Sequence, residues 1–588
     1  MAPPIALRPP SAPRSPPSAS PNRSIFDFRF FSGIALGCVI TTFLHNNAGI
    51  TSFLADTRVS GNLMSGNLQQ WRQQIMGLVT KNGGTGDDVR KRTYCYYGGV
   101  ITLDDEDTRH KCFTLSPDRG TFERVFTPDD GPNIGNLRVE LTDASEGKYI
   151  WYPGTAVPGF WDGHGHVLQY GEMLESVQLF GAGSVEEVRR RVKEYIKQHP
   201  GAGTRENWVR GIGWDQAYFD GKMPTADDLA RDPKLEGLYI LLDRVDVHCT
   251  WASPAVLSLL PSPLPEIPGG FTPSPGIFCD NSMTLPFSFY PPPNSTTLSS
   301  YLTTAQSHLH SYGIVGVHDA SVPASTLRLY DALADANKLS LRVYAMHECS
   351  TRNSFCLNDP HEVPPHRRNL SLEHQIHHLQ STGHPILRAV KLFSDGALGS
   401  RGAALLEPYT DDPTTSGTLL VTPEHLTNVT TSWIQAGWQV NIHAIGDRAN
   451  RVALDALITG LRSLCTNSSS SSSDDDDDDD DITTCIQSHQ HHLRTRIEHT
   501  QIITPSDQSR LLTHHILPSL QPTHAISDSR YALSRLGPDR LTSSAYRIKS
   551  FLRPENNTSN GIVMGSDFPV ESPDVVAGMR AAVGRRVY

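Results

Sequence analysis

The residues best suited to chemistry are two histidines separated by one glycine, His164 and His166, in the segment VPGFWDGHGH at 157–166. Alternate residues of a strand point to the same side, so two imidazoles can reach one metal ion from the end of a single strand. The apolar stretch before them is typical of a buried strand that delivers ligands to the open end of a barrel. For either histidine alone, a satisfied position in a core or rim is the competing interpretation.

Four later segments each resemble a short apolar strand that carries a ligand-type residue at or near its end. These residues are Lys391 in RAVKLFSD, His443 in QVNIH, His499 in RIEH and Asp567 in GIVMGSD. Histidine and carboxylate are preferred ligands of zinc and similar divalent ions. Their recurrence on successive strand ends favours a metal site over a set of unrelated core histidines.

Strands and helices alternate from about residue 158, which is the pattern of a parallel α/β fold. One helix is marked by a capping box, in which Ser184 and Glu187 satisfy each other's backbone donors. Further strands are predicted at 208–214, 239–242, 314–318, 341–346 and 516–520. Because the total exceeds eight strands, we expect an elaborated TIM-type (β/α)8 barrel. Before the barrel, 94–104, 137–139 and 149–152 are predicted to form a few antiparallel strands.

Longer stretches around these residues form an ordered set of motifs. They are PGFWDGHGH (158–166), GIGWDQ (211–216), DRVDVH (243–248), VKLFSDGALGSRGA (390–403), HAIGDR (443–448), RIEH (496–499), QPTH (521–524) and GSDFPVE (565–571). The chain resembles the amidohydrolase superfamily, specifically amidohydrolase family 3, which includes YtcJ-like and N-substituted formamide deformylase-like proteins. The resemblance covers roughly residues 94–583 and is specific for the family, but it does not indicate the substrate.

The resemblance implies a metal-dependent hydrolase barrel over 158–588, with 94–157 contributing to a small β-sandwich. It implies that His164 and His166 share one metal and that His443 and His499 hold a second. Lys391 lies where related enzymes have a carboxylated lysine that bridges two metals, and an ordinary ion-pairing lysine remains open. Two ions, with zinc as the first choice, are expected, and a single ion is the alternative.

Asp567 has the most demanding predicted role. A metal lowers the pKa of its bound water to near neutrality, and Asp567 can ligate the metal, accept the proton and deliver it to a leaving nitrogen. His248 is a candidate donor to the developing oxyanion. The predicted substrate-side residues are Trp214, Asp215, Arg401 and His524, although Trp214 and Asp215 equally fit roles in packing.

The expected reaction is hydrolysis of an amide-type or formamide-type C–N bond, other than a peptide bond, in a small-molecule substrate. A lactonase or other ester hydrolase on the same site is the first alternative, because the same hydroxide attacks either carbonyl. A non-catalytic, membrane-anchored, truncated relic is the second. The chain of 588 residues carries a net charge of −11, of which eight charges come from the aspartate run at 474–481. No basic stripe indicates nucleic-acid binding.

Both ends of the chain carry expectations of their own. Residues 1–29 are predicted to be a disordered tail, and 30–55 a signal-anchor or signal peptide, because four arginines precede this uncharged segment and no charge follows until Asp56. We therefore expect entry into the secretory pathway, with membrane contact through this segment and a lumenal or extracellular catalytic domain. The insert at 466–484 is predicted to be disordered, with Cys465 and Cys485 either bonded or free. The chain ends soon after Asp567, so an incomplete β-sandwich is expected. The sequence does not indicate an oligomeric state.

Overall fold

The computed structural model describes residues 92–104, 106–116, 121–128, 150–465, 478–552 and 561–584. The chain divides into two compact units, Met1–Pro158 and Gly159–Tyr588. The segments predicted as a disordered tail and a signal-anchor lie outside the described residues. Among the residues that are described, no helix combines the length and apolar character needed to cross a membrane.

The first unit contains one five-stranded sheet with the path β3-β2-β1-β4, and β5 pairs with β1. Its strands are β1 (Arg92–Ile101), β2 (Arg109–Leu115), β3 (Phe122–Phe126), β4 (Ile150–Tyr152) and β5 (Thr155–Ala156). The strands β1, β2 and β3 are antiparallel, but β4 and β5 run parallel to β1, so the prediction that 149–152 is antiparallel is wrong. A disulfide between Cys95 and Cys112 joins facing residues of β1 and β2. The predicted strand at 137–139 lies outside the described residues.

The second unit is built on an eight-stranded parallel sheet with the order β19-β18-β17-β16-β15-β14-β13-β6. The strands are β6 (Phe160–Gly165), β13 (Ile314–Val322), β14 (Arg342–His347), β15 (Ile386–Phe393), β16 (Gln439–Ala444), β17 (Arg496–His499), β18 (Leu517–Leu520) and β19 (Val563–Met564). The two ends of the sheet meet, because the backbone N–H of Asp567 donates to His164 O at 2.8 Å and that of His166 to Phe568 O at 2.8 Å. The predicted TIM-type barrel is confirmed.

Helices pack around this barrel. They are α4 (Val167–Glu175), α9 (Ser295–Ser311), α10 (Ala324–Asp335), α11 (Leu372–Thr382), α12 (Pro423–Gln435), α13 (Asp447–Cys465), α14 (Asp478–Leu493), α15 (Pro505–Thr513) and α19 (Val575–Gly584). All six residues of β16 are buried, as expected for a parallel strand that is covered on both faces. Hydrogen bonding between such buried strands fixes the positions of the residues at their carboxyl ends relative to one another.

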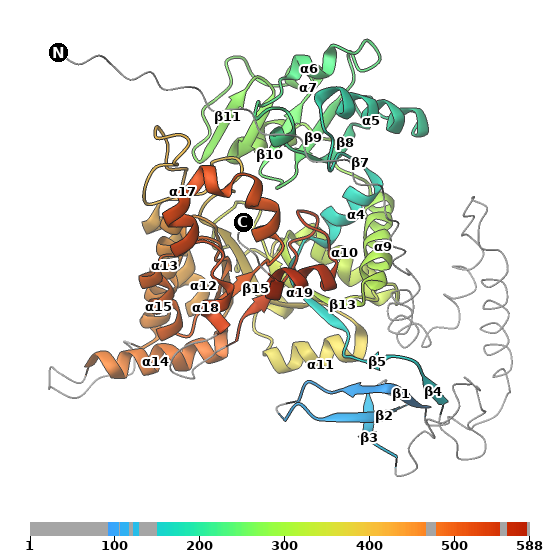
Figure 1. The fold of residues 1–588 in the computed structure, drawn as a ribbon, viewed down its shortest axis with the longest axis vertical. Helices are drawn as coiled ribbons and strands as arrows, with labels where there is room; N and C mark the ends of the chain where they lie inside the picture. The colour runs from blue at the N-terminus through green and yellow to red at the C-terminus, as the bar shows by residue number, and fades with distance from the viewer. Residues whose placement is uncertain are drawn as a thin grey trace, which may run out of the picture. The chain divides into compact units, whose positions relative to one another are not determined.

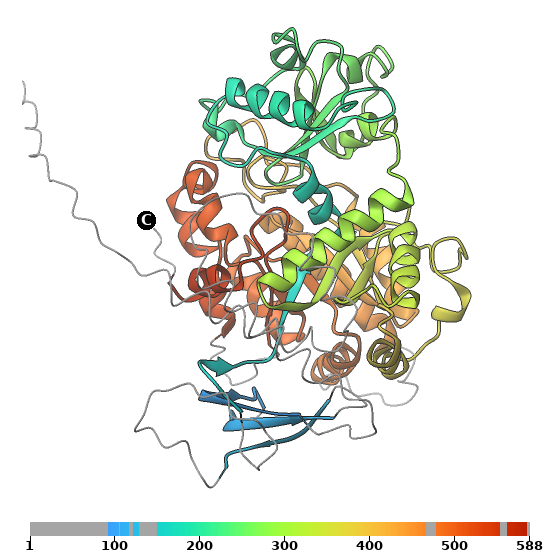
Figure 2. The same cartoon turned by 90° about the vertical axis from the view of Figure 1, so that its right-hand side faces the viewer.

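An additional domain, residues 177–290, is inserted between α4 and α9 and lies over one end of the barrel (Figure 1 and Figure 2). Its six-stranded sheet has the order β11-β12-β10-β9-β8-β7. The strands are β7 (Val177–Gln178), β8 (Val209–Trp214), β9 (Ile240–Arg244), β10 (Cys249–Ala252), β11 (Gly270–Ser274) and β12 (Ile277–Asp280). The predicted strands at 208–214 and 239–242 therefore exist, but they belong to this inserted domain and not to the barrel.

Two local predictions have different outcomes. Helix α5 (Val185–Gln198) begins as predicted, with the Ser184 hydroxyl accepting from the backbone N–H of Glu187 at 3.2 Å. The predicted disordered insert is wrong at its C-terminal end, because α14 begins at Asp478. Tertiary packing explains the difference, since Ile486 of this helix is fully buried and a disulfide joins Cys485 to Cys465 of α13. Residues 466–477 lie outside the described part of the chain.

Candidate metal centre and active site

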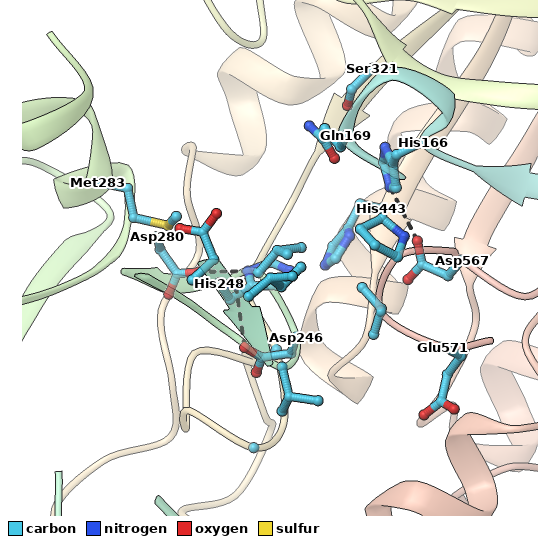
Figure 3. A pocket seen from close by; sticks show the side chains of 18 of the residues that line it. His166, Gln169, Asp246, His248, Asp280, Met283, Ser321, His443, Asp567 and Glu571 are labelled. Atoms are coloured by element: carbon cyan, nitrogen blue, oxygen red, sulfur yellow. Dashed lines mark hydrogen bonds and ion pairs between the residues drawn. The ribbon is translucent and has the colours of Figure 1, made fainter. Parts of the chain in front are cut away.

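A cavity of about 460 Å³ lies between the carboxyl ends of the barrel strands and the inserted domain. Figure 3 shows His166, His443 and Asp567 on one side of it, and Asp246, His248, Asp280 and Met283 on the other. The barrel side contains most of the predicted ligands. The carboxyl end of a barrel is where enzymes of this fold carry their active sites.

Three of the predicted ligands converge most closely. One ligand atom from each of His164, His499 and Asp567 lies within 4.8 Å of the other two. Asp567 Oδ1 lies 3.5 Å from His164 Nε2 and 3.1 Å from His166 Nε2. These side chains come from β6, from the end of β17 and from the segment after β19, so barrel closure brings them together.

The histidine rings are held by groups behind them. His164 Nδ1 donates to Glu498 Oε2 at 2.6 Å, His166 Nδ1 to Ala320 O at 2.8 Å, and His499 Nδ1 to the side-chain oxygen of Gln521 at 2.9 Å. A proton on Nδ1 leaves the lone pair on Nε2, which is the form that binds a metal. The arrangement therefore fixes both the orientation and the tautomer of these rings.

Electrostatics favour neutral rings beside an ionised carboxylate. Burial, together with the nearby Lys391, lowers the pKa of His164 to about 4. Burial opposes ionisation of Glu498, but Arg496 and His164 hold the pKa of this carboxyl far below its usual range. Arg496 donates from Nε to Glu498 Oε1. The Glu498 carboxylate thus stays ionised and accepts the hydrogen bond from His164 Nδ1, which leaves Nε2 of the ring free to bind a metal.

Lys391 lies at the centre of the cluster. Its ammonium nitrogen lies 3.1 Å from His164 Nε2, and the side chain is almost fully buried. Burial lowers the pKa of Lys391 to about 8. The Phe393 ring centroid lies 5.1 Å from this nitrogen, no carboxylate of the described residues forms an ion pair with it, and a buried cation without a carboxylate partner is costly.

His443 completes the row of imidazoles. Its ring centroid lies 4.5 Å from that of His499 and 5.3 Å from that of His248. Its Nε2 is buried and has no hydrogen-bond partner among the described residues, and Asp395 Oδ1 lies 3.6 Å away. Converging imidazoles, a carboxylate and an unsatisfied nitrogen form a donor set that fits a divalent cation such as zinc.

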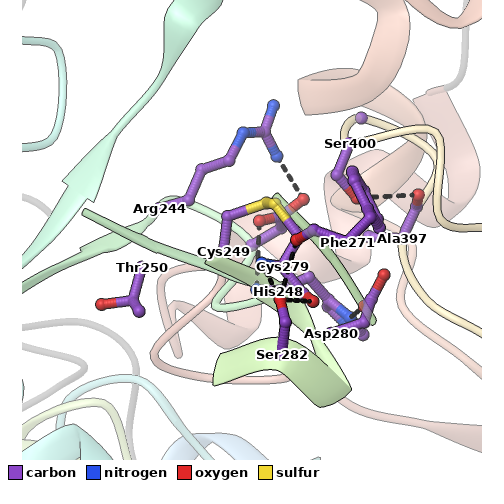
Figure 4. Close-up of a disulfide and its surroundings, with 12 residues drawn as sticks. Arg244, His248, Cys249, Thr250, Phe271, Cys279, Asp280, Ser282, Ala397 and Ser400 are labelled. Carbon is purple, nitrogen blue, oxygen red and sulfur yellow. Dashed lines mark hydrogen bonds and ion pairs between the residues drawn. A yellow bond between two sulfur atoms is a disulfide. The ribbon is translucent and has the colours of Figure 1, made fainter. Parts of the chain in front are cut away.

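His248 faces this cluster from the inserted domain. Its Nδ1 donates to Asp280 Oδ1 at 2.8 Å, and the backbone N–H of Asp280 donates to His248 O at 2.8 Å. The disulfide Cys249–Cys279 joins the chain neighbours of these two residues, since Cys249 follows His248 and Cys279 precedes Asp280 (Figure 4). The pair is therefore anchored by both the sheet and a covalent bond.

Asp280 also lies close against the loop that follows β15 of the barrel. It has a positive φ of 51°, and its carboxylate is fully buried. A Cβ on Gly396 would lie 2.4 Å from Oδ1, and one on Gly402 would lie 2.6 Å from Oδ2. Any side chain at Gly396 or Gly402 would therefore collide with the Asp280 carboxylate, so both positions require glycine.

The predicted substrate-side residues separate into two groups. His524 lines the cavity, with Nε2 3.7 Å from Asp567 Oδ2 and its ring stacked on that of His499. Trp214 does not line it: the indole is fully buried in the core of the inserted domain and donates to Leu242 O at 2.9 Å. Arg401 lies outside the cavity, in an ion pair with Asp411 at 3.1 Å. Asp215 lies behind the wall, paired with Arg244 and with the lining residue Arg530.

Sequence reasoning missed several buried carboxylates. Asp162 accepts from the backbone N–H of His164 at 3.0 Å and from the Ser566 hydroxyl at 2.7 Å, so it joins the two strand ends that carry ligands. Burial raises the pKa of Asp162 to about 6. Glu498 and Asp280 were missed as well. For Asp162 and Glu498, the available signal was a charged residue inside an apolar strand, directly beside a predicted ligand.

Comparisons with known proteins agree with this geometry. A model described as the amidohydrolase family matches residues 154–588. Protein LONG AFTER FAR-RED 3 of Arabidopsis thaliana is 28% identical over 467 residues, which cover 77% of this chain and 70% of that protein. The putative amidohydrolase YtcJ of Bacillus subtilis is 26% identical over 506 residues, covering 81% and 82%.

Among solved structures, an uncharacterized metal-dependent hydrolase from Pyrococcus horikoshii superposes with a TM-score of 0.57 at 26% identity, covering 84% of this chain and 86% of that one. A second, from Pyrococcus furiosus, gives a TM-score of 0.58 at 24% identity, covering 84% and 89%, and shows the fold. Since the family model spans most of the chain, this protein belongs to the amidohydrolase family.

Proposed function

We propose that this protein is a metal-dependent hydrolase that cleaves amide-type C–N bonds, other than peptide bonds, in small molecules. The observation that carries the proposal is the convergence of His164, His499 and Asp567 at the carboxyl end of a closed barrel. His166, His443 and Lys391 would complete a site for one or two divalent ions, with zinc as the first choice. Membership in the family and the likeness to metal-dependent hydrolases from Pyrococcus support this proposal.

When bound, the cation supplies a water of lowered pKa and a Lewis acid for the substrate carbonyl. Asp567 accepts the proton of the attacking water, since its Oδ1 and Oδ2 face His166 and His524 at the floor of the cavity. Asp567 then returns this proton to the leaving nitrogen. Glu498 and Gln521 hold the rings of His164 and His499 and take no part in bond cleavage.

His248 is proposed to stabilise negative charge on the substrate oxygen from the inserted domain. Asp280 holds its Nδ1, so the other ring nitrogen is the atom left to act. An amine leaves only after protonation, and the proton that Asp567 takes from the attacking water would supply it. The same residues would also serve a lactonase.

Lys391 is proposed to be carboxylated. Its buried ammonium would lose one proton, and the resulting amine would take up CO₂ and release a second proton, which converts the cation into an anionic carbamate ligand. Its position 3.1 Å from His164 Nε2, among other proposed ligands, supports this assignment.

We also propose that the catalytic domain lies in the secretory pathway or outside the cell, with the membrane contacted through residues 30–55. Within the described residues, four disulfides join eight cysteines, a usage typical of oxidising compartments.

Metal content and a substrate screen test the proposal together. Purified folded protein should contain one to two equivalents of zinc, manganese or iron, and less than about 0.2 equivalents would overturn it. Metal-loaded protein is then assayed against formamides, N-acyl amino acids and lactones. Turnover of lactones alone would replace the C–N assignment with an ester hydrolase.

A further inference from the structure

A second group of metal-binding side chains lies at the end of β14, apart from the catalytic cluster. It contains His347, Cys349, Cys356 and Glu362. One ligand atom from each of the first three lies within 4.8 Å of the others. None of the four lines the catalytic cavity. They come from a short segment of the chain, so the site is local to the strand end and the loop that follows.

Two distances from His347 match those between neighbouring ligands of one ion, and Glu362 lies just outside the three-residue cluster. His347 Nε2 lies 3.4 Å from Cys356 Sγ and 3.5 Å from Glu362 Oε2. Zinc bonds of about 2.0–2.3 Å to nitrogen, oxygen and sulfur place neighbouring ligand atoms about 3.3–3.8 Å apart. The two sulfurs are closer together than two separate ligands of one ion would be, because Cys349 and Cys356 are joined in a disulfide.

The histidine and the glutamate are presented as ligands. His347 Nδ1 donates to Val322 O at 3.0 Å, which leaves the lone pair of Nε2 facing Cys356 and Glu362. Glu362 Oε1 accepts from the backbone N–H of Ser350 at 3.0 Å. Its Oε2 is buried and has no hydrogen-bond partner among the described residues. An unpaired buried carboxylate oxygen is costly, and a cation at this position would satisfy it.

We propose that reduction of the Cys349–Cys356 disulfide creates a Zn²⁺ site whose ligands are these two cysteines, His347 and Glu362. A thiol or dithiol reductant supplies two electrons and two protons, which cleave the S–S bond and give two thiols while the reductant becomes a disulfide. Zn²⁺ then displaces both thiol protons and binds two thiolates, one imidazole and one carboxylate. The same loop is cross-linked in both states, by sulfur when oxidised and by metal when reduced.

The site borders the catalytic cavity without contributing to its chemistry. Glu348, between two of the proposed ligands, lines the cavity and pairs with Arg352 at 2.9 Å. Either cross-link, the disulfide or the zinc ion, therefore holds this part of the cavity wall. In a chain whose disulfides have not yet formed, the zinc ion would keep Glu348 in place.

Cobalt absorption of the full-length protein tests the proposal. Protein treated with a phosphine reductant and loaded with Co²⁺ should show a thiolate-to-cobalt charge-transfer band with about one equivalent bound, and unreduced protein should not. The ligands proposed for catalysis include no sulfur, so this band is independent of catalytic metal and of activity. Absence of the band from reduced protein that keeps its far-ultraviolet circular dichroism would overturn the proposal.

Matched variants locate the site. The double variant C349S/C356S should lose the band, whereas C465S/C485S should keep it, although Cys465 and Cys485 also have a histidine, His489, close by. Glu362→Gln should weaken Co²⁺ binding by about 10-fold or more, as expected when a charged ligand is removed. A band that persists in C349S/C356S would refute the assignment.

If reduction unfolds the chain, a variant that needs no reductant decides the question. Cys349→His leaves Cys356 as a thiol and offers a second imidazole in place of the lost sulfur. Unreduced Cys349→His should bind Co²⁺ with a thiolate band, and Cys349→Ala should bind at least about 10-fold more weakly. Equal binding by the two variants would refute the site.

Discussion

The two walls of the catalytic cavity are built from different kinds of contact. On the barrel wall, three imidazoles, those of His164, His166 and His499, each have one acceptor behind the ring. On the wall formed by the inserted domain, charged pairs dominate, and Arg210 lies between Glu172 at 2.9 Å and Asp243 at 2.7 Å. The first arrangement orients the proposed metal ligands, and the second shapes and charges the space above them.

This difference indicates a division of labour. The barrel wall would carry the reaction, because its residues converge on a single point. The inserted wall would select substrates, because Met283 and Phe287 line it among the charged pairs. The exception is His248, which reaches from the inserted domain to within 5.3 Å of His443, measured between ring centroids. Variants on the two walls should therefore have effects of different kinds and sizes.

The largest effect is expected from Asp567→Asn on the barrel wall. The amide keeps the shape of the side chain but removes the base, so kcat should fall by about 10²- to 10⁴-fold. Circular dichroism and metal analysis should show a folded protein that still binds metal. Hydrolysis at the wild-type rate would rule out the proton-transfer role of Asp567.

Glu498→Gln should act on the metal and not directly on the reaction. The His164 ring loses its charged acceptor, and metal affinity should fall by about 10- to 100-fold, measured by competition with a chelator. The control is Glu348→Gln, which alters a carboxylate of the cavity without touching a proposed ligand ring. If both variants bind metal equally well, the barrel wall does not depend on the groups behind its rings.

Asp280→Asn tests the single point where the inserted wall takes part in the reaction. Loss of the carboxylate frees the His248 ring, so kcat/KM should fall by about 10²-fold, the lower range for loss of an oxyanion donor. Metal content should not change. Gly396→Ala should give a similar defect, because its Cβ would lie 2.4 Å from Asp280 Oδ1. A wild-type rate in both variants would show that His248 needs no anchor.

Met283→Ala should change selectivity and leave the reaction intact. Enlarging an apolar part of the wall typically alters the ratio of kcat/KM between two substrates by about 10-fold or more. The measurement compares a small and a bulky substrate found in the screen. An equal loss of activity on the small and the bulky substrate would show that Met283 supports the reaction itself, as the barrel wall is proposed to do, and does not select substrates.

Arg401→Ala should have the smallest effect. The guanidinium is about one-third exposed in its pair with Asp411, and such pairs contribute about 0–1 kcal/mol to stability. The melting temperature and kcat/KM should stay near wild-type values. A large loss of activity would restore the original prediction that Arg401 contacts the substrate.

The sequence predicted the barrel, and the residues that converge at its carboxyl end, better than the inserted wall. His164, His443 and His499 stand on or at the end of apolar strands, and parallel topology alone brings strand ends together. A strand pattern does not say which sheet a strand joins, so it leaves open whether 208–214 belongs to the barrel and whether Trp214 lines the cavity or packs in a core. Asp280 could not be identified, because its role depends on two glycines of a distant loop. The pairing of cysteines is likewise a tertiary property that spacing does not determine.

The closure between β6 and β19 has a consequence for how the metal centre comes into being. His166 and Asp567 face each other across 401 positions of the chain. During synthesis, the two histidines of β6 are made early, and an ion that reaches them then finds imidazoles without the aspartate. The full donor set exists only after the last strand has docked beside the first. Full metal uptake by a newly made chain would therefore follow the completion of the barrel. A metal-loading assay would then also measure folding.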